Sequence, residues 1–297
     1  MRENVGFVGA GIMGKPMAMN LLKKGFKVSV LPHRNMAPIE GLRSAGASVA
    51  RNLRELGAQS PVVILMLPGP TEIEQVIVGD GELLEAMKPD STIIDMSTSD
   101  PDVTRRLAAI VESHGCHLLD APVSRGHAGA IAGTLSIMVG GRRDVFERCR
   151  PVLEAMGTDI IYVGPNGTGH AVKLLHNLKT ETEIALIAEI LALAERVNVP
   201  LKPLLEVFGV SSANSYSLQT KAPKIVNRDF EPGFTLRFAH KDLRLGTMLA
   251  ERAGQPLFLA NVAKQLYQMA IDEGLGEKDV TAVYLILERP QKEEGSK

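Results

Sequence analysis

The chain opens on a glycine-rich turn that directly follows a short apolar run. Residues 4–8 are rich in β-forming side chains, and Gly9, Gly11 and Gly14 then give a G-x-G-x-x-G spacing before a segment of good helix propensity. In a strand–turn–helix unit the first glycine permits the tight turn, the second lets the backbone approach a pyrophosphate, and the third lets helix and strand pack closely. The helix N-terminus adds N–H groups and a positive dipole end that attract phosphate. The stretch therefore predicts a dinucleotide-binding βαβ unit.

Length and charge limit the kind of protein this chain can be. Its 297 residues predict about two domains, since a domain averages roughly 150 residues. A net charge of −1 provides no basic field for nucleic acid, and no apolar run approaches the roughly 18–20 residues of a membrane helix. No signal peptide fits, because the glycine motif begins so early. Neither nucleic acid nor a membrane is therefore expected as a partner.

Cysteine and histidine usage points to neither disulfides nor a metal. Cys116 and Cys149 fit no C-x-x-C or zinc spacing, and such low cysteine usage suits a reducing cytoplasm. His114 and His117 have no third ligand at a suitable spacing. We therefore expect a cytoplasmic protein without a metal site.

The residues after the second predicted strand (27–31) favour one dinucleotide over another. An NAD site usually places an acidic residue here, about 20 positions after the glycines, to hold the ribose 2′-hydroxyl. This chain has His33, Arg34 and Asn35 instead, and its next acidic residue is Glu40. A guanidinium suits a 2′-phosphate through charge-assisted hydrogen bonds. We expect NADP(H), with NAD as the alternative; the competing interpretation is that Arg34 is only a solvated loop charge.

Helix and strand patterns alternate up to residue 164. The expected helices cover 17–24, 48–57, 72–78, 83–87, 102–114 and 143–156, and further strands cover 61–68, 92–96, 117–120, 135–141 and 160–164. Continuous apolar strands suit a parallel sheet covered on both faces, so the pattern predicts an α/β fold with a Rossmann-type doubly wound sheet. Ligands of such sheets bind beyond the carboxyl ends of the strands. The turns at Leu67-Pro68, Ser97-Thr98 and 121–124 are therefore where we expect a site.

A glycine-rich break at 164–169 separates this part from a second half with few strand signals. We place the domain boundary there, with a dinucleotide-binding domain over 1–166 and an all-α domain over 167–297 that begins with a long joining helix (169–197). Shorter helices are expected at 202–208, 218–226, 241–253, 257–273 and 280–287. Lys173 and Asn177 share one face of the long helix. By residue type alone, such a lysine is more often a surface group than a catalyst.

Together these motifs resemble the β-hydroxyacid dehydrogenase family, which includes 3-hydroxyisobutyrate dehydrogenases and tartronate semialdehyde (2-hydroxy-3-oxopropionate) reductases. The resemblance covers about residues 4–290. It rests on the segments 9–18, 66–68, 95–98, 120–124, 133–141, Gly167-x-Gly169 with Lys173 and Asn177, and 241–243. Each segment is weak alone, but their order and distances are specific.

The resemblance implies roles for individual residues. Lys173 matches the catalytic acid/base, and Asn177 matches the residue that holds substrate beside it. An ammonium group would stabilise and protonate the alkoxide formed when an aldehyde is reduced. Asp242 is implied as structural support. The cofactor residues implied are Gly9, Ala10, Gly11, Ile12, Met13, Gly14, Leu67, Pro68, Ser97, Thr98 and Lys241, and the substrate residues are Ser124, Gly126, Asn177 and Phe234.

The loop at 124–127 departs from the family. The common pattern is Ser-Gly-Gly, whose amides grip the substrate carboxylate, but Arg125 replaces a glycine here. A guanidinium can bind an anionic group bidentately, and sulfolactaldehyde reductases are similar in carrying an arginine at this place. The alternative is that Arg125 forms an inter-subunit salt bridge. His127 is interpreted as a loop residue.

The resemblance and the residues together predict an oxidoreductase that transfers a hydride between NADP(H) and a small β-hydroxy acid or its semialdehyde. The alternatives are a sulfolactaldehyde-type reductase using Arg125, an imine reductase on the same architecture, or a non-catalytic NADP-binding sensor. Lys173 argues against the last two. An apolar surface all round residues 184–193, and the dimers and tetramers of the family, indicate a homodimer or homotetramer.

Overall fold

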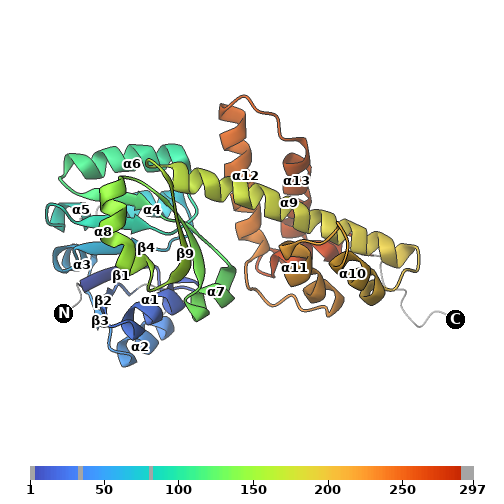
Figure 1. Ribbon diagram of the computed structural model, residues 1–297, viewed down its shortest axis with the longest axis horizontal. Helices are drawn as coiled ribbons and strands as arrows, with labels where there is room; N and C mark the ends of the chain where they lie inside the picture. Colours follow the sequence, from blue (N-terminus) through green and yellow to red (C-terminus); the bar gives the residue numbers. More distant parts are fainter. Residues whose placement is uncertain (1–3, 33–35, 80–82, 289–297) are drawn as a thin grey trace. The chain divides into compact units, whose positions relative to one another are not determined.

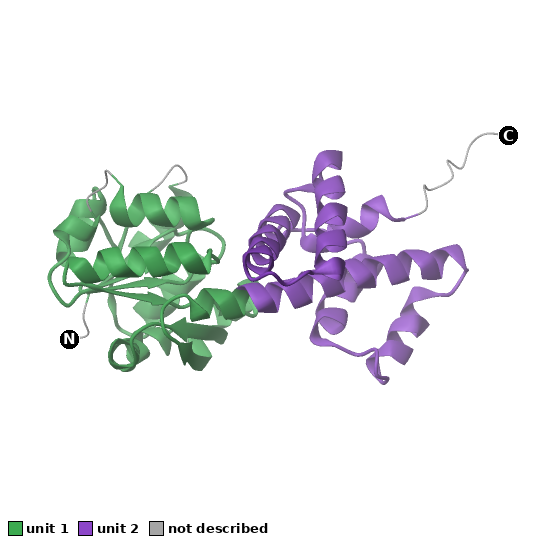
Figure 2. Ribbon diagram, turned by 90° about the horizontal axis from the view of Figure 1, so that it is seen from above, with its two compact units in different colours: residues 1–173 green, residues 174–297 purple. Residues whose placement is uncertain are grey.

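The computed structural model describes residues 4–32, 36–79 and 83–288. The chain forms two compact units, residues 1–173 and 174–297, and the division falls within the long helix α9 (Thr168–Arg196) (Figure 2). The boundary predicted at 166/167 lies just ahead of this helix and stays a prediction. Each unit is described by itself below.

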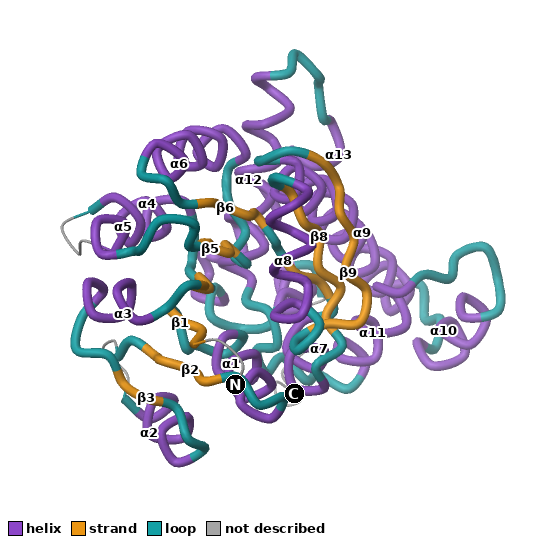
Figure 3. Tube along the Cα trace, turned by 60° about the vertical axis from the view of Figure 1, so that its left-hand side comes forward, coloured by secondary structure: helices purple, strands orange, loops and turns teal. Residues whose placement is uncertain are grey.

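Unit 1 contains a nine-stranded sheet in the order β3-β2-β1-β4-β5-β6-β8-β7, with β9 beside β8 (Figure 3). Neighbouring strands from β1 to β6 pair in parallel, whereas β8 is antiparallel to β6 and parallel to β9. The strands are β1 (Asn4–Val8), β2 (Lys27–Val30), β3 (Ser48–Val49), β4 (Val62–Leu65), β5 (Thr92–Asp95), β6 (His117–Asp120), β7 (Val123–Ser124), β8 (Leu135–Gly140) and β9 (Gly157–Gly164). The predicted doubly wound sheet is confirmed.

Helices cover both faces of this sheet (Figure 1). One core contains side chains from α1 (Gly14–Lys23), α2 (Ala37–Ser44), α7 (Gly126–Ala132) and α8 (Arg143–Leu153). The other contains side chains from α3 (Leu53–Gln59), α4 (Pro70–Val78), α5 (Leu83–Ala86) and α6 (Pro101–Ser113).

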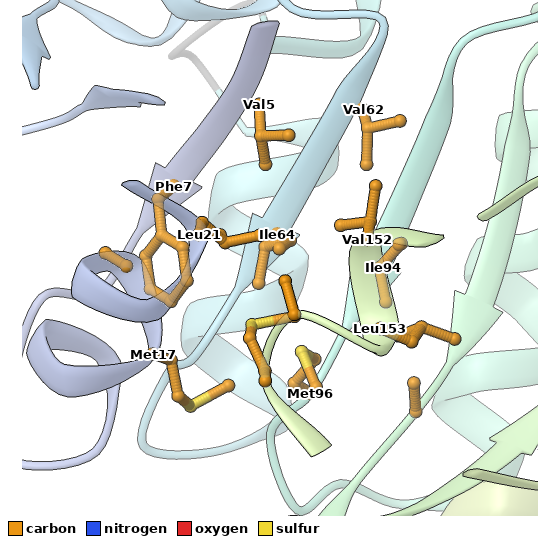
Figure 4. Packing of buried hydrophobic residues seen from close by; sticks show 14 of the residues in the cluster. Val5, Phe7, Met17, Leu21, Val62, Ile64, Ile94, Met96, Val152 and Leu153 are labelled. Carbon is orange, nitrogen blue, oxygen red and sulfur yellow. The ribbon is translucent and has the colours of Figure 1, made fainter. Parts of the chain in front are cut away.

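Alternate residues of each central strand serve the two cores. Ile64 packs with Met17 and Leu21 in one core (Figure 4), and its neighbours Val63 and Leu65 belong to the other. This two-sided burial explains why the strands read as continuous apolar runs.

Residues 48–57, predicted as one helix, form two elements instead. Ser48 and Val49 pair with β2 as the short strand β3, and α3 begins only at Leu53. The Asn52 side chain accepts a hydrogen bond from the backbone N–H of Glu55 at 2.8 Å, an N-cap that fixes the start of the helix. Helices α2 and α7 and strand β7 were also not predicted, because each is short and lacks a clear apolar period.

Unit 2 is helical, as predicted. After α9 it contains α10 (Leu201–Gly209), α11 (Tyr216–Val226), α12 (Leu236–Arg252), α13 (Phe258–Ala270) with a π-helical extension (Ile271–Leu275), and a 3₁₀ helix (Val280–Ile286). Helix α12 begins earlier than the expected residue 241, because Thr235 caps it by accepting from the N–H of Phe238. Across the described ranges, no helix is long and apolar enough to cross a membrane.

Asp279 ties the segment before α12 to the 3₁₀ helix. Its Oδ2 accepts from the N–H of Gly233 at 3.0 Å, its Oδ1 accepts from the Thr281 hydroxyl at 2.9 Å, and the ammonium groups of Lys221 and Lys224 each lie 3.6 Å away. Burial of Asp279 disfavours its ionisation most strongly, but Lys221, the N–H of Gly233 and Lys224 together hold its pKa below the usual range. The carboxylate therefore stabilises unit 2 while it is charged.

Asp279→Asn is expected to lower the free energy of unfolding at pH 7 by about 1–3 kcal/mol, because a buried acceptor of charge-assisted bonds is lost. A carboxylate with a lowered pKa stabilises fully above its unfolded pKa of about 4, and loses that contribution as the pH falls through its folded pKa. The difference from the native protein should shrink on acidification, measured by urea unfolding between neutral and acid pH. An equal difference across that range would contradict the charge assignment.

Candidate active site

The glycine turn is built so that two of its glycines admit no side chain. Gly9 has a φ of +99°, and a Cβ there would lie 2.1 Å from the carbonyl oxygen of Met66. A Cβ on Gly14, the first residue of α1, would lie 1.9 Å from the carbonyl oxygen of Gly9. Both clashes are with backbone, which cannot give way. These glycines are therefore required for the strand, turn and helix to pack together.

Gly11 is different, because a Cβ there would meet no atom within 4 Å. No side chain caps the N-terminus of α1, and no acidic residue lies in its first turn. In the same turn Ile12 is exposed, and Ala10 and Met13 are partly buried. The protein's own packing thus gives no reason for a glycine at this position. Open space beside an uncapped helix end fits the close approach of a pyrophosphate.

Two further turns lie beside the glycine turn at the carboxyl ends of β4 and β5. Met66 N–H donates to the carbonyl of Val8 at 2.9 Å, and Leu67 N–H donates to Ser97 Oγ at 2.9 Å. Pro68 is exposed and Thr98 is partly buried. The structure therefore brings these predicted cofactor residues together with the glycine turn. His33, Arg34 and Asn35 lie outside the described residues, so the choice of NADP over NAD stays a prediction.

Arg125 has partners within its own chain. Its Nη1 lies 2.7 Å from Asp159 Oδ2 and donates to the carbonyl of Thr134 at 2.8 Å and to Thr158 Oγ1 at 3.1 Å. Its φ is +81°, a conformation that favours glycine and so fits the family pattern at this place. Neither role considered from the sequence, a substrate contact or an inter-subunit bridge, included this pairing.

The neighbours of Arg125 frame the same loop. Ser124 ends strand β7 opposite Ser136 of β8, and Gly126 is exposed with a φ of +57°. Their contact with substrate remains a prediction.

A buried carboxylate fixes the start of α9. Asp120, at the end of β6, accepts from the N–H of Gly167 at 2.9 Å and from that of His170 at 3.0 Å. Gly140 and Gly169 make room for it, since a Cβ on either would lie within 2.9 Å of an Asp120 oxygen. A negative charge at a helix N-terminus is favourable. No role was predicted for Asp120 from the sequence. An acidic residue at the end of an apolar strand, directly before Ala121-Pro122, could have indicated one.

Asn177 is buried on α9 and held by Asp242 of α12. Its Nδ2 donates to Asp242 Oδ2 at 2.5 Å, and Asp242 Oδ1 lies 2.9 Å from the Lys241 ammonium. Because a carboxylate only accepts, the amide nitrogen must face Asp242 and the amide oxygen must face His176, whose Nδ1 is 2.9 Å away. Asp242 thus orients Asn177 and pairs with Lys241.

Two aromatic rings lie beside Lys241. The Lys241 ammonium is 5.7 Å from the centroid of the Phe238 ring, which stacks on Phe234 at 6.4 Å. Unit 2 therefore brings the predicted residues Phe234, Lys241 and Asn177 into one connected group. Phe238 was missed, because the predicted helix began too late to place it one turn before Lys241.

Lys173 is partly buried and lies one turn ahead of Asn177 on α9. Positions i and i+4 share a helix face, so the two side chains point to the same side of α9. Over the described residues there is no group of three or more His, Cys, Asp or Glu side chains placed to hold a metal ion.

Two family models match this chain. Residues 4–164 match the NAD binding domain of 6-phosphogluconate dehydrogenase, and residues 167–287 match a model described as NAD-binding of NADP-dependent 3-hydroxyisobutyrate dehydrogenase. A fold and site of this kind define a nicotinamide-dependent oxidoreductase.

Relatives that match over almost the whole chain are named as dehydrogenases or reductases. The chain is 38% identical to 2-(hydroxymethyl)glutarate dehydrogenase of Eubacterium barkeri, covering 96% of this chain and 95% of that protein. It is 34% identical to 3-sulfolactaldehyde reductase of Escherichia coli (strain K12), covering 94% of each. The structure of Mycobacterium tuberculosis 3-hydroxyisobutyrate dehydrogenase with L-serine matches with a TM-score of 0.88 and 33% identity, covering 97% of this chain and all of that one.

The chain therefore belongs to the β-hydroxyacid dehydrogenase family and is an NAD(P)-dependent oxidoreductase. This confirms the predicted family, enzyme class and cofactor type. The roles of individual side chains stay predictions.

Gly11→Ala and Gly14→Ala form a matched pair that separates binding from folding. Gly11→Ala should leave the melting temperature unchanged but weaken NADPH binding about tenfold or more, because its methyl group occupies the space open to the pyrophosphate. Gly14→Ala should lower the free energy of unfolding by about 1–3 kcal/mol or more, because its methyl group would clash with the backbone carbonyl of Gly9. Calorimetry and NADPH fluorescence titration would measure both. Native-like NADPH affinity in Gly11→Ala would contradict this placement of the cofactor.

Proposed function

We propose that this enzyme transfers a hydride reversibly between NADP(H) and a small β-hydroxy acid or its semialdehyde, with Lys173 as proton donor and acceptor. The observation that carries the proposal is the pairing of Lys173 with Asn177 on one face of α9, a helix whose start is fixed by Asp120. Relatives named for hydroxymethylglutarate, hydroxyisobutyrate and sulfolactaldehyde support this substrate class.

A bound nicotinamide supplies or accepts the hydride. The protein's part is to manage the charge that develops on the substrate oxygen. In reduction, the Lys173 ammonium stabilises the growing alkoxide and then protonates it. In oxidation, the neutral amine accepts the hydroxyl proton.

Asn177 positions the substrate. One N–H of its amide donates to Asp242 and its oxygen faces His176, so the second N–H remains to bind a substrate oxygen. Because Lys173 and Asn177 are one helical turn apart, substrate held by Asn177 lies beside the ammonium group.

We further propose that NADP(H) is preferred, through Arg34, over NAD(H). The low cysteine content, with Cys116 and Cys149 both buried, supports a reducing cytoplasm as its location. Exposed apolar side chains on α9 support a homodimer or homotetramer, and they include Leu186, Ile190 and Leu193. Analytical ultracentrifugation would test the assembly, and a monomer at micromolar concentration would contradict it.

A sulfolactaldehyde-type activity is the second candidate, and it depends on Arg125. The guanidinium must exchange Asp159 for the substrate anion if it is to bind substrate. Because the pair is about half exposed, that exchange costs little. A sulfolactaldehyde-type activity therefore predicts that KM for anionic aldehydes depends on Arg125.

Arg125→Gly restores the residue type that the local φ favours, so it should fold at least as stably as the native enzyme. If Arg125 binds the distal anion, KM for sulfonated or carboxylated aldehydes should rise about tenfold or more, because a charge-assisted bond is lost. Asp159→Asn is the matched variant, since it frees Arg125 and should lower the same KM. Unchanged KM values in both variants would leave Arg125 with a structural role only.

Lys173→Met should reduce kcat for NADPH-dependent reduction by about 10²- to 10⁴-fold, the usual contribution of a positioned acid. NADPH affinity and melting temperature should stay close to native. Lys179→Met is the control, because Lys179 lies on the same helix but is exposed and pairs with Glu183. Substrates would be small aldehydes carrying carboxylate, sulfonate, phosphate or no acid, with NADH in parallel. Tight NADPH binding without turnover of any of them would favour the sensor or imine alternatives.

A further inference from the structure

His170 contacts both of the buried carboxylates at the ends of β5 and β6, Asp95 and Asp120. Its backbone N–H donates to Asp120, and its ring is fully buried in the first turn of α9. Nδ1 lies 2.7 Å from Thr104 Oγ1, and Nε2 lies 3.7 Å from Asp95 Oδ2 with no hydrogen-bond partner among the described residues. All of these groups belong to unit 1.

The hydrogen bonds of Thr104 decide which ring nitrogen carries a proton. Its hydroxyl lies 3.0 Å from the carbonyl oxygen of Asp100, which can only accept. The single hydroxyl hydrogen therefore points to Asp100, and the hydroxyl oxygen must accept from His170. Nδ1 is thus protonated.

The other nitrogen faces a carboxylate. Without a further proton, the lone pair of Nε2 would point at Asp95 Oδ2, and two buried acceptors would oppose each other. Asp95 and Asp120 are also register partners in β5 and β6. Burial chiefly raises the pKa of Asp95, and the neighbouring charge of Asp120 adds to the rise. The geometry therefore favours one proton on either His170 Nε2 or the Asp95 carboxyl.

Asp95 also connects to the predicted cofactor site. Its Oδ1 accepts from the N–H of Ser97 at 3.0 Å, and Ser97 Oγ accepts from the N–H of Leu67. One carboxylate thus links the turn after β4 to the helix that carries Lys173, three residues beyond His170.

We propose that His170 is a positioning residue for Lys173, and that it shares a buried proton with Asp95 which fixes the rotation of the first turn of α9. The kinetic consequence rests on the proposed function, whereas the shared proton does not. The catalytic role of Lys173 and the dinucleotide site would stand even if the dyad of His170 and Asp95 were disproved. The dyad is therefore tested separately.

The first test is histidine NMR on the native protein labelled with ¹⁵N at the imidazole nitrogens, with the His170 signals assigned by their loss in His170→Gln. At pH 7 Nδ1 should carry a hydrogen, and a second proton should lie on Nε2 or on the Asp95 carboxyl, whose ¹³C signal is followed in the same sample. A bare Nε2 facing an ionised Asp95 carboxylate would overturn the shared proton. This arm needs no turnover, so it stands even if the proposed activity fails.

The second test compares two substitutions that each keep one donor. The amide nitrogen of glutamine replaces Nε2 and can donate to Asp95, whereas that of asparagine replaces Nδ1 and faces Thr104. His170→Gln should keep kcat within about threefold, and His170→Asn should lower kcat about 10- to 100-fold with little change in KM or NADPH affinity, as expected for a misplaced catalytic group. His114→Gln is the control. Equal loss in both variants, or a change in KM alone, would overturn the positioning role.

Discussion

The hydrogen bonds that Asp120 accepts from the N–H groups of Gly167 and His170, at the start of α9, are the constraint on which the site depends. They join the end of a central strand to the start of the helix that bears Lys173 and Asn177. An α-helix turns by about 100° per residue, so a start displaced by one residue would turn both side chains together away from their present direction. A carboxylate with no solvent exposure, accepting from two amides, leaves little freedom for such a slip.

The parts of the structure that could be predicted from sequence are those set by local patterns. Gly9 and Gly14 are dictated by contacts within a single strand–turn–helix unit, and continuous apolar runs identify the central strands. The turns at 67–68 and 97–98 followed from the rule that parallel strands end at a common edge. Helix starts were less certain where a side-chain cap decides them, as Asn52 and Thr235 do.

What escaped prediction depends on residues brought together from far apart in the chain. The roles of Asp120 and His170 arise from the register of β5 with β6 and from the rotation of α9, neither of which has a local signature. The partner of Arg125 lies on β9, and the orientation of Asn177 is decided by α12. The residue types were visible in the sequence, but their partners were not.

The central claim is that the Lys173 ammonium supplies the proton for the reaction. Chemical rescue of Lys173→Ala tests it most directly: the single-turnover rate of NADPH oxidation with a reactive semialdehyde is measured while small primary amines are added at constant pH. We predict a very low rate that rises with amine concentration and depends on amine basicity, as general acid catalysis requires. A near-native rate without amine, or no response to any amine in a variant that binds NADPH normally, would contradict the claim.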